Sequence, residues 1–224
     1  MKSILLIVLL ALTAGCTYAQ TAPPLAKPYL HRAPALSSWI ITYTYKTDAP
    51  KPGETSPKPT PVAIDRIVSV TVIKNGKTYN EVTLWTSGRR DEKWNLDGIQ
   101  LSTSADGRSI VPIPPPTEEV PQPDYSDYSR HDFEGFEWLA ADHYKGVEER
   151  QGTPAFHFAS GTKQQAYLSV ENHLPLLLDD GEIERTYTYT KPDAAALVPP
   201  EKFVKVLRDY KAGMAALRFH ASPP

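Results

Sequence analysis

The sequence predicts a mainly β protein: one curved antiparallel sheet, an incomplete barrel, with an amphipathic C-terminal helix on its concave face. Short runs in which β-branched and aromatic residues alternate with polar ones recur along the chain, with the period of two that is typical of strands. Turn residues, often glycine, separate these runs, and only one segment, near the C-terminus, has helical spacing. We place a single domain at residues 38–218, which is long enough to bury a core of its own.

Residues 1–15 have the features of a secretory signal peptide. A basic start is followed by an apolar run at 4–12, which is shorter than the roughly 20 residues of a membrane-spanning helix. The small residues before Cys16, the only cysteine, resemble the bacterial lipobox, in which cleavage leaves a lipidated cysteine. This resemblance predicts a lipid anchor at Cys16 that holds the protein to the envelope membrane facing the periplasm, and Thr17 favours the outer membrane. Cleavage after Ala19, giving a soluble periplasmic or secreted protein, is the alternative.

Proline accounts for 22 of the 224 residues, about twice the usual ~5%. Because proline cannot donate to a strand ladder, its clusters predict extended segments rather than central strands. These clusters mark a Pro-rich tether over residues 16–37 and mobile loops over 48–62 and 112–130. The net charge of −2 gives no electrostatic footprint for nucleic acid, so we expect no nucleic-acid partner.

Strands are predicted wherever the alternation recurs between turn residues. The expected strands cover residues 39–45, 68–72, 82–85, 92–96, 99–103, 109–113, 143–150, 154–159, 164–171 and 182–190. A short apolar piece at 174–178 contains Pro175, which predicts an edge strand or a bend.

The hairpin around Asn75-Gly76 raises a question of register. A two-residue Asn-Gly loop would place Val70 opposite Glu81 and mix polar and apolar side chains on one face. A three-residue loop that ends at Gly76 would place Val68 opposite Val82 and keep that face apolar. We expect the three-residue loop, because a slip of one residue inverts every side chain.

One helix is predicted over residues 200–218, opened by a proline pair that suits the first turn. Gly213 interrupts it, at a cost of about 1 kcal/mol relative to alanine. We expect the helix to pack on the sheet, and a movable lid is the alternative. Its apolar stripe consists of Phe203, Leu207, Tyr210, Met214 and Leu217.

The predicted strands near the C-terminus carry motifs of a known family. After Trp138 come a Gly-x-Pro turn at 152–154, a hairpin from Ala166 to Pro175 and an aromatic strand at 185–189. These features resemble the closing strands of the lipoprotein-carrier (LolA/LolB-like) superfamily. The resemblance implies an incomplete antiparallel barrel around an apolar cavity that binds acyl chains. Where the carriers begin with a helix this chain has its tether, and the lipid-anchored receptor of the superfamily agrees better with Cys16.

These observations predict a non-enzymatic cell-envelope lipoprotein that binds an apolar ligand or an acylated partner, with no metal and no cofactor. The expected partner is a lipid or the acyl chain of a lipoprotein. The candidate cavity residues are Trp39, Ile41, Tyr43, Val68, Val70, Val82, Leu84, Trp94, Trp138, Phe203 and Leu207.

Two other functions remain open from the sequence. The same fold with a filled core would be a structural or interaction module that uses its acidic loops as a partner surface. A secreted hydrolase has only the pairs His131-Asp132 and Asp142-His143 in its favour, and their spacing matches no zinc pattern.

Overall fold

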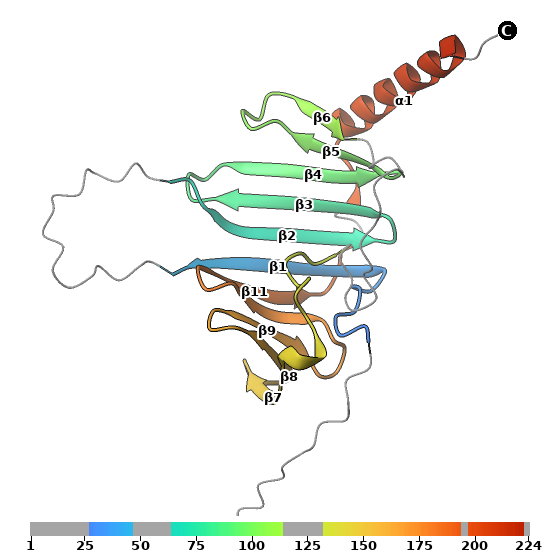
Figure 1. The fold of residues 1–224 in the computed structure, drawn as a ribbon. Coiled ribbons are helices and arrows are strands. Elements are labelled where there is room, and N and C mark those ends of the chain that lie inside the picture. Colours follow the sequence, from blue (N-terminus) through green and yellow to red (C-terminus); the bar gives the residue numbers. More distant parts are fainter. Residues whose placement is uncertain (1–26, 47–63, 114–131, 194–196, 222–224) are drawn as a thin grey trace, which may run out of the picture.

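The structure, a computed structural model, describes residues 27–46, 64–113, 132–193 and 197–221. Within them an antiparallel sheet of 11 strands is followed by one long helix (Figure 1). The elements are β1 (Leu36–Tyr45), β2 (Ile67–Asn75), β3 (Thr78–Trp85), β4 (Arg90–Leu96), β5 (Ile99–Thr103), β6 (Ile110–Ile113), a 3-10 turn (Ala141–His143), β7 (Tyr144–Arg150), β8 (Thr153–Ser160), β9 (Gln164–Ser169), β10 (Pro175–Asp179), β11 (Ile183–Thr190) and α1 (Glu201–Ala221).

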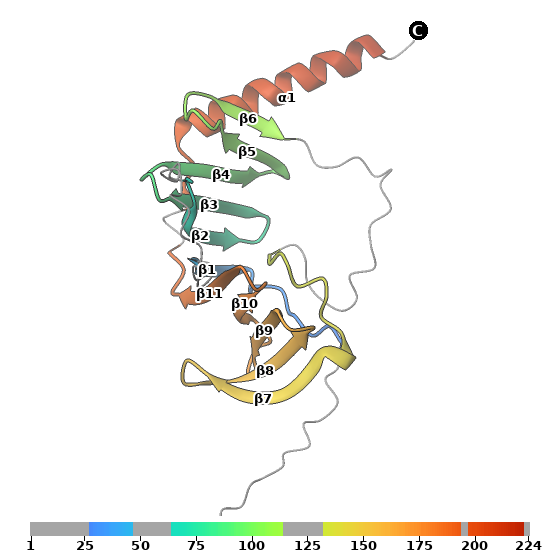
Figure 2. The same cartoon turned by 60° about the vertical axis from the view of Figure 1, so that its left-hand side comes forward.

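Strand β1 lies at the centre and joins two antiparallel meanders, β2 to β6 on one side and β11 to β7 on the other (Figure 2). In its register Ile41 lies opposite Val70 of β2 and Tyr187 of β11. The outermost strands β6 and β7 do not pair with each other, so the sheet does not close into a barrel. The predicted fold class, a mainly β protein with an open antiparallel sheet and one C-terminal helix, is confirmed.

Two chain segments fill much of the hollow of the sheet. Tyr29 and Leu30 belong to the first and are 3% and 0% exposed. The second, residues 132–139, which we call the strap, buries Phe133, Phe136 and Leu139 in the same core. Residues 27–37 are therefore part of the folded domain and not of the predicted tether, because their apolar side chains gain more from burial than from solvent. Residues 1–26 and 47–63, with the segment 114–131, lie outside the described part of the chain.

The β2–β3 hairpin has a different register from the predicted one. Asn75 pairs with Thr78, so the loop is Gly76-Lys77, and Gly76 supplies the positive φ of +60° that such tight turns require. Val72 consequently lies opposite Glu81. The expectation of one apolar face across this hairpin was wrong, because the turn fixes the pairing and places Glu81 and Thr83 opposite Val72 and Val70.

A register shift between Ile67 and Ser69 also changes the predicted orientation of Val68. Ile67 lines the same face as Val70, while Val68 is turned outward and is 37% exposed. A bulge of this kind inserts one residue and re-aims the side chains beyond it.

Helix α1 does not lie on the concave face, and this part of the prediction was wrong. Phe203 and Leu207 pack against Trp94 of β4 and Leu101 of β5. Their strand neighbour Lys93 points to the other face, towards the strap, and successive strand residues alternate between faces. The helix therefore covers the outer face of β4 and β5, because that is where the apolar side chains of these strands point.

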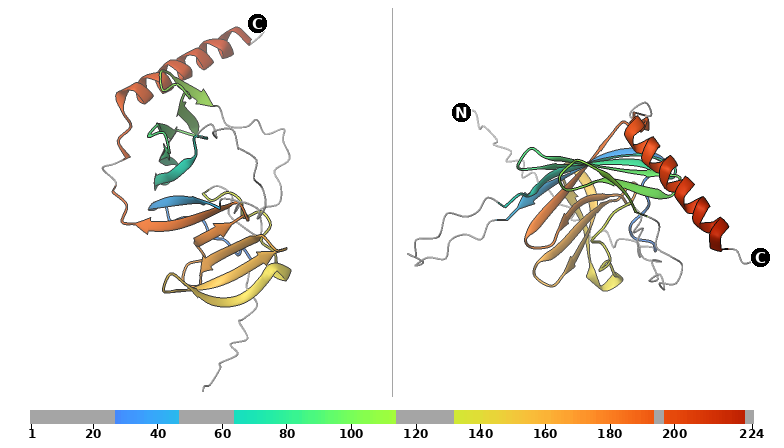
Figure 3. Two further views of the ribbon diagram at one scale, coloured as in Figure 1. Left: turned by 90° about the vertical axis from the view of Figure 1, so that its left-hand side faces the viewer. Right: turned by 90° about the horizontal axis from the view of Figure 1, so that it is seen from above.

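Beyond this contact the helix has little packing. Residues 211–216 are exposed, and α1 projects past the edge of the sheet (Figure 3). Among the helix residues whose burial is described, the buried ones, Phe203 and Leu207, lie in the first half and anchor it there.

Of the two alternatives for residues 174–178, an edge strand or a bend, the edge strand is excluded, since β10 lies between β9 and β11. Pro175 is tolerated there because it is the first residue of the strand and sits at a register shift in the pairing with β9. Leu177 and Leu178 are both buried, on opposite faces, so β10 contributes to two clusters of the core.

A pair of stacked histidines joins the N-terminal segment to the β9–β10 turn. The rings of His31 and His173 lie 4.2 Å apart at 8°. Nδ1 of His173 lies 3.1 Å from the carbonyl oxygen of Tyr29, and the N–H of His31 donates to the carbonyl of His173 at 3.2 Å. Burial lowers the pKa of His173, and the adjacent His31 lowers it further, against the hydrogen bond to Tyr29.

We expect this contact to make the fold sensitive to acid. Because the pKa of His173 is lower in the folded state, the unfolded state binds more protons, so stability is lost as pH falls below about 6.5. Urea unfolding at pH 7.5 and pH 5.5 measures the loss. His173→Asn removes the titrating ring and tolerates the φ of +60°, so its stability should fall less between the two pH values. An equal fall in both proteins would show that other groups cause the acid response.

Candidate functional site

A pocket of about 340 Å³ lies on the inner face of the sheet, where β1 to β5 and β11 meet the beginning of the strap. Its wall on β1, β2 and β11 is mostly apolar and aromatic, with Lys74 and Arg185 at its ends. Its wall on β3, β4 and β5 is polar. The two walls meet along the β2–β3 pairing described above, because Val70 and Val72 lie opposite Thr83 and Glu81 there.

The apolar wall is built by neighbouring residues of three strands. Trp39 lies opposite Val72, and Ile41 opposite Val70 and Tyr187, with all of them facing the pocket. Phe133 of the strap closes this side: its ring lies 5.4 Å from that of Trp39 and 5.9 Å from that of Tyr187. Trp39 is only 2% exposed, so this wall is an extension of the core.

The polar wall consists of Tyr79, Glu81 and Thr83 of β3 with Lys93 of β4 and Gln100 of β5. Nζ of Lys93 bonds Glu81 at 2.7 Å. Burial lowers the pKa of Lys93, but the Glu81 carboxylate outweighs it and the net pKa is raised, so the Lys93 ammonium stays charged at neutral pH. Burial also raises the pKa of Tyr79, so its hydroxyl keeps its proton.

Asp132 ties three parts of the chain together at one end of the pocket. Its carboxylate accepts a bond from Nζ of Lys74 on β2 at 2.5 Å and another from the N–H of Ala33 at 3.0 Å. The side chains of Lys74 and Asp132 are 16% and 6% exposed. The strap, the N-terminal segment and the sheet are thus joined by one carboxylate.

Arg185 of β11 lies at the other end, under the strap. It pairs with Asp180 at 3.3 Å, and its guanidinium lies 5.9 Å from the ring centre of Tyr43. Gly135 of the strap has a φ of +89°, and a Cβ there would come within 2.9 Å of Nη1 of Arg185. The strap can lie this close to Arg185 only because the residue is glycine. Glu134, beside it, is exposed at the pocket.

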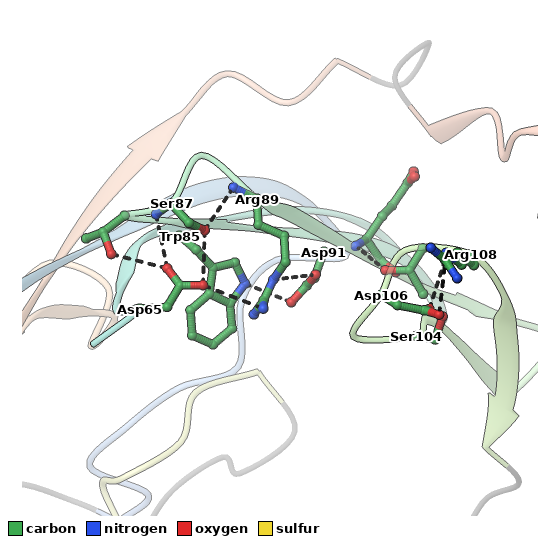
Figure 4. Close-up of polar contacts among 11 residues, drawn as sticks. Asp65, Trp85, Ser87, Arg89, Asp91, Ser104, Asp106 and Arg108 are labelled. Carbon is green, nitrogen blue, oxygen red and sulfur yellow. Dashed lines mark hydrogen bonds and ion pairs between the residues drawn. The ribbon is translucent and has the colours of Figure 1, made fainter. Parts of the chain in front are cut away.

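The β3–β4 turn at the border of the pocket is fixed by a separate polar cluster (Figure 4). The guanidinium of Arg89 stacks on the ring of Trp85 at 4.2 Å and contacts Asp91 at 3.2 Å and Asp65 at 3.5 Å. Desolvation opposes ionisation of Asp65, but bonds from Ser87 and the Arg89 charge give a net lowering of its pKa. Each charged or polar side chain of this cluster contacts another member of the cluster. The cluster therefore stabilises the turn and does not offer a side chain to a ligand.

The β5–β6 turn has its own short cluster, also drawn in Figure 4. Asp106 accepts bonds from the hydroxyl of Ser104 at 2.5 Å and from the N–H of Arg108 at 3.0 Å. These bonds, with that from Ser104 the larger, lower the pKa of Asp106. The cluster stabilises an exposed turn and lies apart from the pocket lining.

The structure brings some of the predicted cavity residues together and leaves others elsewhere. Trp39, Ile41, Tyr43 and Val70 line the pocket. Val82 and Leu84 point to the opposite face of β3, since they alternate with Glu81 and Thr83, and Val68 is exposed. Trp94, Phe203 and Leu207 form the separate cluster beneath α1. Trp138 packs against the main core, and its Nε1 donates to the carbonyl of Gly135 at 3.0 Å.

The polar residues of the pocket were missed by the sequence reasoning. The alternation of Tyr79, Glu81 and Thr83 on one face of β3 was visible, but polar residues were assumed to face solvent. Asp132 was considered only with His131, and nothing in the sequence paired it with Lys74. Glu134, Lys93 and Arg185 gave no local signal, because their position depends on contacts between distant segments.

The side chains considered for catalysis have other contacts in the structure. Nδ1 of His143 lies 2.6 Å from the carbonyl of Trp138, and Asp132 binds Lys74. His131 lies outside the described residues. Within the described ranges, no group of three or more His, Cys, Asp or Glu side chains could hold a metal ion. The residues described as lining the pocket include no histidine, cysteine or serine.

Comparison with known proteins gives only distant structural likenesses. No protein-family model and no curated protein sequence matches the chain. A solved structure of the MucA/MucB complex of Pseudomonas aeruginosa is similar over 75% of this chain, with 16% identity and a TM-score of 0.34. The match covers 56% of the length of that protein chain. Membership in the LolA/LolB-like superfamily stays a prediction, and the proposals below rest on the geometry of the pocket.

The structure does not test the predicted membrane anchor. Cys16 lies outside the described residues, so its lipidation stays a prediction. In the part of the chain that the structure describes, no helix combines the length and the apolar character needed to cross a membrane.

Proposed function

We propose that this protein is an exported, non-enzymatic binding protein of the cell envelope, held to the membrane by a lipid on Cys16. Its pocket takes an amphipathic ligand or the acylated end of a partner. The observation that carries the proposal is the pocket itself, with an apolar wall along Trp39, Ile41 and Val70 and a polar wall along β3, β4 and β5. Ligand sites are typically concave and mostly apolar, with a few polar groups that fix orientation.

The size of the pocket limits what can bind. About 340 Å³ is near the lower end of the ~300–1,000 Å³ typical of ligand sites. Phe133, Phe136 and Leu139 occupy the neighbouring hollow. The pocket therefore takes part of an acyl chain, and a longer chain would have to displace the strap.

The filled hollow favours a second candidate function. Leu30 and Phe136 are fully buried in the core, where the resemblance to the carriers implies an acyl-binding cavity. A protein whose hollow is filled by its own side chains is a structural or interaction module, and the pocket would then be a residual gap. Saturable binding in the pocket separates the two functions.

We expect Thr83→Phe to weaken ligand binding at least about tenfold, or about 1.4 kcal/mol. Thr83 lines the pocket and is half-buried, so a phenyl ring there fills space that a ligand would occupy. Dodecanoate and dodecyl maltoside, both below their micelle concentrations, are suitable probes. Trp39 lies in the apolar wall and reports binding by its fluorescence, and affinities should be about micromolar.

Val82→Phe is the matched control, because Val82 is the next residue of β3, is also half-buried and points to the opposite face. It should bind both probes as the unmodified protein does. If neither probe binds saturably, the protein is not a ligand carrier and the filled module is the better interpretation. Equal weakening by both variants would place binding away from the pocket.

A further inference from the structure

We propose that the polar wall of the pocket recognises an uncharged, hydroxyl-rich group, such as a sugar ring, while the apolar wall holds the attached hydrocarbon. The inference rests on the proposed function and names the ligand class for that site. Three features carry it: the charges of the lining balance, the buried polar atoms in and beside the lining include unpaired donors and an unpaired acceptor, and the aromatic residues of the lining are amphipathic.

The charges of the lining cancel. The basic side chains Lys74, Lys93 and Arg185 are matched by the acidic side chains Glu81, Asp132 and Glu134. All three cations already hold carboxylates: Lys74 that of Asp132 at 2.5 Å, Lys93 that of Glu81 at 2.7 Å and Arg185 that of Asp180 at 3.3 Å. An anionic head group would have to displace one of these carboxylates. A neutral head group leaves every pair intact.

The buried polar atoms without a hydrogen-bond partner include both donors and an acceptor. Nε1 of Trp39 and Nε of Arg185 are buried donors of lining residues that have no hydrogen-bond acceptor. Oδ1 of Asn95 is a buried acceptor without a donor, and Asn95 lies opposite Tyr79 of the polar wall. Buried polar groups are normally paired, so each of these atoms calls for a partner. A hydroxyl both donates and accepts, whereas a carboxylate or phosphate only accepts and an ammonium only donates.

The side chains of the polar wall are also suited to hydrogen bonding with hydroxyl groups. The hydroxyl of Tyr79 also interacts with the side chain of Asn95, but its bond to Oε1 of Gln100 is 3.5 Å long, the limit of a hydrogen bond, so its proton and Gln100 can turn to a ligand. Tyr43 and Tyr79 are half-buried in the lining and combine an apolar ring face with a protonated hydroxyl. A sugar ring presents the complement, with C–H groups on its faces and hydroxyls around its edge.

The strap gives such a ligand a way to reach the buried donors. Trp39 is covered by Phe133 and Arg185 by Gly135, so both orphan donors lie beneath strap residues. A shift of these residues as the ligand enters would bring its hydroxyls within reach of both donors. Their present lack of acceptors is a cost that binding would relieve.

Three amphiphiles with the same dodecyl chain test the inference: dodecyl maltoside, dodecylphosphocholine and dodecanoate, each below its micelle concentration. We expect calorimetric titration of the full protein to show at least about tenfold tighter binding of the maltoside than of the other two. Equal or tighter binding of dodecanoate or dodecylphosphocholine would overturn the sugar-type head group while leaving the pocket function intact. Binding of none of the three would overturn the proposed function as well.

The Tyr79→Phe variant adds a test that does not depend on the dodecyl chain of the ligand. It removes one hydroxyl without changing the shape of the wall, and should weaken maltoside binding about three- to tenfold while leaving dodecanoate unchanged. Tyr210→Phe, the same change on α1, is the control and should alter neither. Equal weakening of the maltoside and dodecanoate by Tyr79→Phe, with an unchanged melting temperature, would contradict hydroxyl recognition by this wall.

Discussion

The Asp132→Ala variant is expected to lose about 3–5 kcal/mol of unfolding free energy, a large effect for one side chain. Asp132 is 6% exposed and binds Lys74, which is 16% exposed, at 2.5 Å. Removing the carboxylate leaves the Lys74 ammonium nearly buried without its counter-charge. It also removes the acceptor of the Ala33 N–H, so both the strap and the N-terminal segment lose their tie to β2.

Urea denaturation of a small set of variants checks this expectation. Asp132→Asn keeps an acceptor for Ala33 and should lose less than Asp132→Ala. Adding Lys74→Met to Asp132→Ala removes the uncompensated charge and should recover part of the loss. Asp106→Ala, at the exposed β5–β6 turn, is the control and should cost far less. If Asp132→Ala costs no more than that control, the ion pair does not hold the strap.

The second large effect is expected at the foot of the helix. Phe203→Ala should lower the unfolding free energy by about 3–5 kcal/mol, because Phe203 is 0% exposed and its ring lies 6.2 Å from that of Trp94. With half of its anchor removed, α1 should detach from β5 and β6. Hydrogen exchange should then show loss of protection in the helix while β1, β2 and β11 remain protected.

The same variant decides whether the helix acts as a lid. Phe203 packs on the outer face of β4 and β5, away from the pocket, so Phe203→Ala should leave binding of the dodecyl amphiphiles unchanged. Met214→Ala lies on the exposed half of the helix and is the control, with an expected stability change within about 0.5 kcal/mol. Loss of binding in Phe203→Ala, in a protein that is still folded, would show that the helix bears on the pocket.

Much of the sheet could be predicted from the sequence, because alternation is a local property. The alternation around Trp39 predicted β1, and that around Trp94 predicted β4. Alternation shows which residues share a face of the sheet, but not which face is covered by the strap or by the helix. Trp39 points to the hollow and Trp94 to the helix, and only the pairing of the strands distinguishes them. The same limit explains the misplaced helix.

The candidate site could be predicted only in part, for a related reason. Trp39, Ile41 and Val70 were found because they are apolar and lie on adjacent strands. Asp132 and Arg185 come from segments far from β1 in the sequence, and their place depends on how the strap crosses the sheet. Tyr29 and Leu30 were assigned to a tether, because the prolines around them outweighed two apolar residues.

On part of the sheet, the residues that stabilise the fold and the residues that line the pocket lie on opposite faces. On β4 and β5 the side chains that stabilise the fold, Trp94 and Leu101, point outward to the helix, and those that meet the pocket, Lys93 and Gln100, point inward. Substitutions of Gln100 on the inner side are therefore expected to change the pocket with less cost to folding than substitutions of Trp94 or Leu101. The opposite wall offers no such freedom, because Trp39 and Tyr187 are at once pocket lining and buried core.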